Sequence, residues 1–281
     1  MRHLKSIFDF YIKSSLHLSI CVATLLMITF LRLDQEPDLL ILFCSFCASI
    51  VVYNFIKYAS TLPYYFFVKN ISIKKIQILS FMSGFFLLVT IFFLKFETIL
   101  TGFFIFLICV IYVIPVNRTK KNIRNYSRVK LFIVAFCWSS ASVFLPISDQ
   151  SSFLNINTIT LFFQRFFFVI VYSIPFEIRD LKYDSKMLKT IPQVYGLKKT
   201  KCFSYVLIML FLLISPLINP FNYIFITSDI ITAILLFYII YITQINQNKY
   251  FASFWVEGLP VLWLTIIFLL KFIFWENRQS L

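Results

Sequence analysis

The sequence contains few of the charged and titratable residues that soluble enzymes use. Charged residues make up 14% of the chain, and it contains 12 acidic residues and two histidines. Hydrophobic residues make up 60%, whereas soluble globular domains contain about 45–50%. His3 and His17 both fall at the inner membrane interface and offer no catalytic pairing. The composition excludes a soluble globular domain and predicts a chain that has the bilayer as its solvent.

Glycine is scarce as well, with 4 residues in 281. Membrane transporters commonly bind their cargo at helices that Gly or Pro residues interrupt, and they carry ionisable relays inside the bilayer. The sequence shows no Gly-rich broken helix and no evident buried relay, so a transporter is disfavoured. The 6 cysteines lie in or beside apolar stretches. Cys44-x-x-Cys47 lacks a second pair or a nearby His, so neither a disulfide framework nor a cysteine metal site is expected.

Long apolar runs are abundant. A helix needs about 20 apolar residues to cross the hydrocarbon layer, and runs of this kind recur along the whole chain. We expect one all-α transmembrane domain over residues 1–281, a nine-helix bundle. The predicted spans are 15–33, 38–56, 76–94, 97–116, 130–147, 157–176, 203–219, 229–245 and 258–275.

Basic residues give the orientation of these spans. The net charge is +14, and most of the 26 Lys and Arg residues fall in alternate connecting segments. Because cytoplasmic loops accumulate Lys and Arg, the N-terminus is predicted to be cytoplasmic and the C-terminus to lie on the opposite side. The charge is then a sign of topology, and nucleic acid is not needed to explain it. Arg165, inside the sixth span, is expected to snorkel to the interface.

Two inner connections, 117–130 and 177–202, are expected to be long basic loops where chemistry takes place. The second begins with Glu177, Asp180 and Asp184. If the helix continues, their spacing places the three carboxylates on one face, where hard oxygen ligands could bind Mg²⁺. Alternatively, this is a solvated loop whose carboxylates pair with neighbouring basic residues.

Residues 172–201 resemble the second aspartate-rich motif of the UbiA superfamily of intramembrane prenyltransferases. In that family a D-x-x-D-x-x-x-D run precedes a Thr-Leu-Pro-like turn and a Gly. Here the first Asp is Glu177, and the other positions keep their spacing. The nine-helix topology is shared too. The other matching residues are Asp180, Asp184, Thr190, Pro192 and Gly196.

Two more segments extend the resemblance. Residues 112–130, with Tyr112 at their start, resemble the exit of the family's fourth helix and its basic loop, whose cations hold the substrate's diphosphate. Tyr53-Asn54 resembles the beginning of the first motif, N-D-x-x-D-x-x-x-D. The positions that should be Asp are Phe55, Tyr58 and Leu62. Half of the family's metal-binding residues are therefore absent.

The resemblance implies Mg²⁺-dependent transfer of a prenyl chain from a polyprenyl diphosphate to a lipophilic, aromatic acceptor in the membrane. Glu177, Asp180 and Asp184 would be the metal ligands, with Asp180 and Asp184 also catalytic. Aromatic side chains would shield the allylic cation that forms. No protein partner is predicted. The residues expected to bind substrate are Asn54, Tyr112, Arg118, Lys121, Arg124, Lys130 and Lys182.

The degenerate first motif leaves two alternatives. Lys57 lies three residues after Asn54, so both share a helix face. Its ammonium group could replace one metal ion as a fixed positive charge, which would make Lys57 catalytic. Alternatively, the chain is a catalytically inactive UbiA-like lipid-binding or accessory membrane protein. Asn54 could equally form hydrogen bonds between helices, and Glu257, at the start of the last span, could face the cavity or simply favour the helix dipole.

Overall fold

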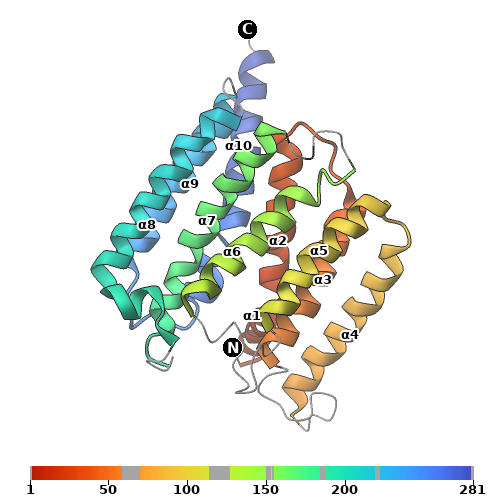
Figure 1. Ribbon diagram of the computed structural model, residues 1–281, viewed down its shortest axis with the longest axis vertical. Coiled ribbons are helices and arrows are strands. Elements are labelled where there is room, and N and C mark those ends of the chain that lie inside the picture. The colour runs from red at the N-terminus through yellow and green to blue at the C-terminus, as the bar shows by residue number, and fades with distance from the viewer. Residues whose placement is uncertain are drawn as a thin grey trace.

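The computed structural model describes residues 2–58, 70–113, 127–149, 153, 155–183, 188–218 and 222–279, without the side chains of 2–3, 111–113, 127–129 and 275–279. The described residues form α-helices and one π-helical turn, which confirms the all-α class (Figure 1). The elements are α1 (Arg2–Lys13), α2 (Leu16–Arg32), α3 (Leu39–Tyr58), α4 (Ile71–Ile91), α5 (Phe96–Val113), α6 (Ser127–Phe144), α7 (Ile156–Asp180), α8 (Ile191–Ile218), α9 (Tyr223–Ile242), η3 (Phe251–Val256) and α10 (Leu259–Gln279).

Each of the nine predicted spans falls on one of the helices α2 to α10. Six of the described helical segments are long and apolar enough to cross a membrane, and the bent pair of α1 and α2 would make a seventh if it counts as one span. Two further apolar helices are shorter, Phe96–Val110 within α5 and Lys130–Phe144 within α6. The protein is a multi-pass integral membrane protein.

Helix α7 lies at the centre of the bundle. It packs against α6 and α8, while α2 contacts α3, α6 and α10. The main buried cluster takes residues from all of these helices and from α9. In Figure 1, α4 lies at one edge of the bundle and α8 at the other, and the two termini lie at opposite ends. Which end faces the cytoplasm stays a prediction.

The peripheral helices turn large apolar side chains outward. On α4, Phe81 and Phe85 are exposed, and on α5, Phe103 and Phe104 are exposed. Neither helix contributes to the main buried cluster among the described residues. In water such a surface would be strongly unfavourable, but lipid tails are as apolar as these side chains. This exposure agrees with the high mean hydropathy of +0.87.

Small hydroxyl residues pack the helices where glycine is scarce. Buried Ser19, Thr29 and Ser204 each donate a hydrogen bond to the carbonyl four residues earlier in their own helix. The hydroxyl group is thereby satisfied without a partner from another helix. Because these side chains are small, neighbouring helices can approach closely, as Gly and Ala allow in other membrane bundles.

Helix α1 was not predicted from the sequence. This helix is strongly amphipathic, and it meets α2 at a bend of 55°, where Ser15 has a φ of 62°. One face of α1 packs against η3, where Phe8 contacts Phe254 with ring centroids 5.0 Å apart. Asp9 accepts hydrogen bonds from Lys249 at 2.5 Å and from Tyr250 at 2.7 Å. The ammonium group of Lys249 has a raised pKa because of the hydrogen bond to Asp9.

Candidate functional site

The last turn of α7 carries two of the three predicted metal-binding carboxylates, and each already lies beside a cation. Lys130 Nζ is 3.7 Å from Oε1 of Glu177, which is 7% exposed. Arg179 donates from Nε to Asp180 Oδ1 at 2.8 Å and from Nη2 to Oδ2 at 3.2 Å. The Asp180 pair is a third exposed, so its attraction is partly screened and the carboxylate can exchange partners.

The end of α3 presents Asn54 and Lys57 to the same hydroxyl group. Ser15 Oγ donates to Asn54 Oδ1 at 2.9 Å and accepts from Lys57 Nζ at 2.9 Å. The amide nitrogen of Asn54 donates to Ser80 Oγ at 2.9 Å, and Asn54 is fully buried. The expected shared face of Asn54 and Lys57 is therefore present. Asn54 forms the interhelical hydrogen bonds that the sequence allowed as an alternative, and its role in binding substrate stays a prediction.

Glu257 connects these two helix ends. It follows the π-helical turn η3, and it is 6% exposed. The cations that act electrostatically on its carboxylate are Lys57 of α3 and Arg179 of α7. Turns of the π type are often found at functional sites because they change the direction of the following side chains. The sequence left open whether Glu257 faces the cavity. In the structure its carboxylate is under the electrostatic influence of Lys57 and Arg179, and a role in binding substrate stays a prediction.

We call this group the site cluster: three cations and three carboxylates that meet where α3, α6, α7 and η3 end or begin. Its charges balance among the described residues, so an additional anion would have to bring a cation or displace a carboxylate. The members of the site cluster are Lys57, Lys130, Glu177, Arg179, Asp180 and Glu257.

Aromatic rings adjoin the site cluster. Trp138 donates a hydrogen bond from Nε1 to the hydroxyl of Tyr53, the residue before Asn54. Trp138 also contacts Tyr172, with ring centroids 5.5 Å apart. Tyr172 in turn donates to the backbone carbonyl of Glu257 at 3.4 Å. The rings form a polar-tipped aromatic wall between the ion pairs and the apolar core.

The segment after α7 is not the long loop that we expected over 177–202. After the described turn at 181–183, α8 already begins at Ile191. Thr190 and Gln193 start it with reciprocal hydrogen bonds: Thr190 N donates to Gln193 Oε1 at 3.1 Å, and Gln193 N donates to Thr190 Oγ1 at 3.4 Å. This capping box satisfies two backbone groups at the helix start. Gly196, with φ 75° and ψ 167°, then kinks the helix, in a conformation that glycine adopts most readily.

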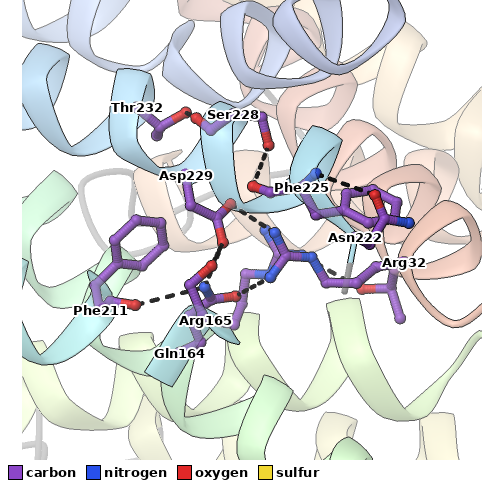
Figure 2. Close-up of polar contacts among 11 residues, drawn as sticks. Arg32, Gln164, Arg165, Phe211, Asn222, Phe225, Ser228, Asp229 and Thr232 are labelled. Atoms are coloured by element: carbon purple, nitrogen blue, oxygen red, sulfur yellow. Dashed lines mark hydrogen bonds and ion pairs between the residues drawn. The ribbon is translucent and has the colours of Figure 1, made fainter. Parts of the chain in front are cut away.

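A second cluster of polar residues, which we call the buried arginine cluster, joins the last turn of α2 to α7 and α9 (Figure 2). Arg32 of α2 donates from Nη2 to Asp229 Oδ1 at 2.6 Å and from Nη1 to Gln164 Oε1 at 2.8 Å. Gln164 Nε2 donates to Asp229 Oδ2 at 2.8 Å. Arg165 lies beside them with its guanidinium carbon 4.6 Å from the centroid of the Trp263 ring.

Arg165 corrects an expectation. It does not snorkel to the interface, because its side chain is fully buried and faces the bundle interior. Arg32, near the end of the first predicted span, is 1% exposed in the last turn of α2. Asp229 lies inside α9, which begins six residues earlier than predicted, at Tyr223. The sequence showed no evident buried relay, and the structure brings Arg32, Arg165 and Asp229 together inside the bundle, where ionisable groups are rare.

Comparison with known proteins identifies the architecture. No protein-family model and no curated protein match the chain. A solved structure of digeranylgeranylglyceryl phosphate synthase, a UbiA-superfamily prenyltransferase, aligns with 96% of this chain and 97% of its own. The TM-score is 0.55, and 20% of the residues are identical. The chain has the UbiA-type fold.

Within the UbiA-type fold, several predicted site residues lie outside the described residues: Arg118, Lys121, Arg124 and Asp184. The backbone of Tyr112 belongs to the last turn of α5, but its side chain is not described. Lys182 is exposed just beyond α7. Of the remaining predicted residues, Asn54 lies beside the site cluster, and Lys57, Lys130, Glu177 and Asp180 are part of it.

A cavity of about 370 Å³ opens between the start of α8 and the end of α9. Lys198, Lys201 and Asn246 are among its lining residues, and no member of the site cluster is. Lys201 donates to the carbonyl of Tyr241 at 2.7 Å across this opening. The cavity is therefore separate from the paired carboxylates.

Proposed function

We propose that this protein is an intramembrane prenyltransferase, which moves a prenyl chain from a polyprenyl diphosphate to a lipophilic acceptor with Mg²⁺ as cofactor. The observation that supports this most is the site cluster, in which two carboxylates at the end of α7 lie beside exchangeable cations in a UbiA-type fold. A diphosphate ester needs both kinds of group: hard anionic ligands for a metal and cations for its own oxygens.

The carboxylates fit a divalent metal by their chemistry. Glu177 and Asp180 offer oxygen ligands three residues apart on one helix, and Asp184, which lies outside the described residues, would be the third. No group of three metal-binding side chains lies together within the described ranges. When bound, Mg²⁺ would neutralise diphosphate oxygens and so make the diphosphate a better leaving group.

The cations of the site cluster would change partners when substrate binds. In the structure, Lys130 and Arg179 lie against Glu177 and Asp180. If these carboxylates turn to a metal, both cations lose their counter-ions and become donors for phosphate oxygens. The buried charge is balanced before and after the exchange, which avoids leaving an unpaired ion in a medium of low dielectric constant.

The reaction that we propose breaks the bond between the allylic carbon and the diphosphate oxygen. Pyrophosphate leaves with the electron pair, the acceptor bonds to the allylic carbon, and the acceptor's proton passes to water. Rings that adjoin the site cluster would stabilise the positive carbon with their negative faces. Tyr53, Trp138 and Tyr172 form such a wall.

Lys57 takes a particular role in this proposal. Where the first motif of the family would supply carboxylates, this chain has the exposed Phe55 and has Tyr58, whose hydroxyl donates to the carbonyl of Lys13 at 3.0 Å. Neither can hold a second metal ion. Lys57, fixed by Ser15, would supply the missing positive charge directly to the diphosphate.

Pyrophosphate release tests the function. Protein in detergent is incubated with geranyl, farnesyl and longer diphosphates, a lipid extract from native membranes, and either Mg²⁺ or a chelator. We expect release that requires Mg²⁺ and that falls by about 100-fold or more in Asp180→Asn, since electrostatic groups at a reacting centre contribute that much. Asp149→Asn is the matched control, because Asp149 pairs with Lys95 in an exposed connection elsewhere.

Binding separates the enzyme from an inactive lipid-binding relative. The degenerate positions 55, 58 and 62 favour the inactive alternative, which predicts that labelled farnesyl diphosphate binds but is never cleaved with any acceptor fraction. Lys57→Ala tests the fixed-charge role. We expect weaker diphosphate binding in that variant and recovery in Lys57→Arg, and an unchanged affinity in Lys57→Ala would remove Lys57 from the proposal.

A further inference from the structure

The buried arginine cluster has more hydrogen-bond donors than acceptors. Arg165 Nε and Nη1, Arg32 Nε and Trp263 Nε1 are buried, and none of them has an acceptor among the described residues. The acceptors nearby are engaged: Asp229 accepts from Arg32, Gln164 and Ser215, and Gln164 Oε1 accepts from Arg32. Buried polar groups without partners are rare in folded proteins, so four donors in one place call for an acceptor.

The charge of the cluster is unbalanced in the same direction. Arg32 and Arg165 carry two positive charges, because guanidinium groups stay protonated in proteins, and Asp229 carries one negative charge. The charged neighbours that act on Arg165 are Arg32, which repels it, and Asp229, which attracts it. One excess positive charge buried inside the bundle is strongly unfavourable without a counter-ion.

The Trp263 ring relieves only part of this imbalance. Its face lies 4.6 Å from the Arg165 guanidinium carbon and 5.9 Å from that of Arg32, which is a cation–π arrangement. The face of an aromatic ring is only a weak hydrogen-bond acceptor, and Arg165 Nε and Nη1 have no acceptor among the described residues. Thr29 Oγ1 accepts from Arg165 Nη2 alone, at 3.5 Å. The other N–H groups of Arg165 therefore still need an acceptor.

We propose that the buried arginine cluster binds a small monovalent anion of the halide type, held by Arg165, Arg32 and Trp263. A halide accepts from several donors and donates nothing, and its single charge balances the cluster. A water molecule fits less well, because it would add two donors to a site that already has too many and would leave the charge uncompensated. This site belongs to α2, α7 and α10 and does not depend on the proposed reaction.

Thermal unfolding of the full chain in detergent tests the anion site. Chloride is exchanged for gluconate at constant ionic strength, and the midpoint is followed by fluorescence. An anion that binds the folded state raises the midpoint in a saturable manner. We expect this rise in the parent protein, its loss in Arg165→Met, and its retention in Lys95→Met, which removes an exposed cation from the connection between α4 and α5.

Trp263→Phe decides the question if Arg165→Met does not fold. This variant keeps the ring and removes one donor, so the chloride concentration for half the rise should increase several-fold. An unchanged concentration would overturn the proposal, as would a parent protein that is indifferent to chloride or an unaltered response in Arg165→Met. Crystals grown with bromide should show an anomalous peak beside Arg165 and Trp263. If anionic lipid raises the midpoint without halide and no bromide peak is found, the ligand is a lipid headgroup and the halide site is refuted.

Discussion

Asp229 offers the sharpest test of the structure, because this buried carboxylate pairs with Arg32 and attracts Arg165. The variant Asp229→Asn keeps the size of the side chain and removes its charge. An amide can still accept with its oxygen, but its NH₂ group would face donors from Gln164 and Ser215. Arg32 would lose its ion pair of 2.6 Å, and Arg165 would lose the charge that attracts it.

The magnitude follows from the burial of the pair. The side chains of Arg32 and Asp229 are both 0% exposed, so the loss of one partner leaves an uncompensated buried charge. Such losses lower the free energy of unfolding by about 3–5 kcal/mol. By the same reasoning, replacing both partners with apolar residues, as in Arg32→Met with Asp229→Leu, should recover at least half of the loss.

Reversible unfolding in mixed detergent micelles, followed by tryptophan fluorescence, measures this difference. Asp149→Asn is the control, since it also removes a carboxylate from an ion pair, but the Lys95 side chain of that pair is 70% exposed. We expect no measurable change there. If Asp229→Asn unfolds within about 1 kcal/mol of the parent protein, the pair is not buried as described and the reasoning fails.

Two further predictions concern the backbone near the site cluster. In Gly258→Ala the new Cβ would lie 2.9 Å from the carbonyl oxygen of Phe254. We therefore expect the free energy of unfolding to fall by about 1–3 kcal/mol in the same assay. Gly84→Ala is the control, because its Cβ would lie 3.8 Å from the nearest neighbouring atom, and it should fold normally. Thr190→Ala removes the hydroxyl that accepts a hydrogen bond in the capping box with Gln193. It should lower the free energy of unfolding by about 1 kcal/mol in the same assay. An unchanged unfolding midpoint would show that this capping box does not stabilise the protein.

The spans could be predicted because membrane helices satisfy their own backbone hydrogen bonds, so hydropathy alone locates them. Helical spacing also predicted that Asn54 and Lys57 share a face, because residues three positions apart lie on the same side of a helix. Helix α1 was also within reach, since Leu4, Ile7, Phe8 and Tyr11 repeat at helical intervals. It was missed because it lies before the first long apolar run and its residues were counted only for their charge.

The partners of buried charges could not be read from the sequence. In a helix that is apolar all round, such as most of α7, periodicity does not show which side faces the bundle. Arg165 was therefore expected at the interface, and only the packing of α2, α7 and α9 brings Asp229 near it. The place of Glu257 depends on the π-helical turn, which has no clear composition signature.

One helix joins the two charged regions. Arg165 and Glu177 are twelve residues apart on α7, which corresponds to about 18 Å along its axis. Pro175 lies between them and cannot donate a backbone hydrogen bond, so the helix is softer just before the carboxylates than beside the arginines. Bending forces from the surrounding lipid would thus be absorbed near Pro175. If the proposed reaction takes place at these carboxylates, its rate would depend on bilayer thickness, and turnover measured in a short-chain detergent would differ from turnover in native membrane.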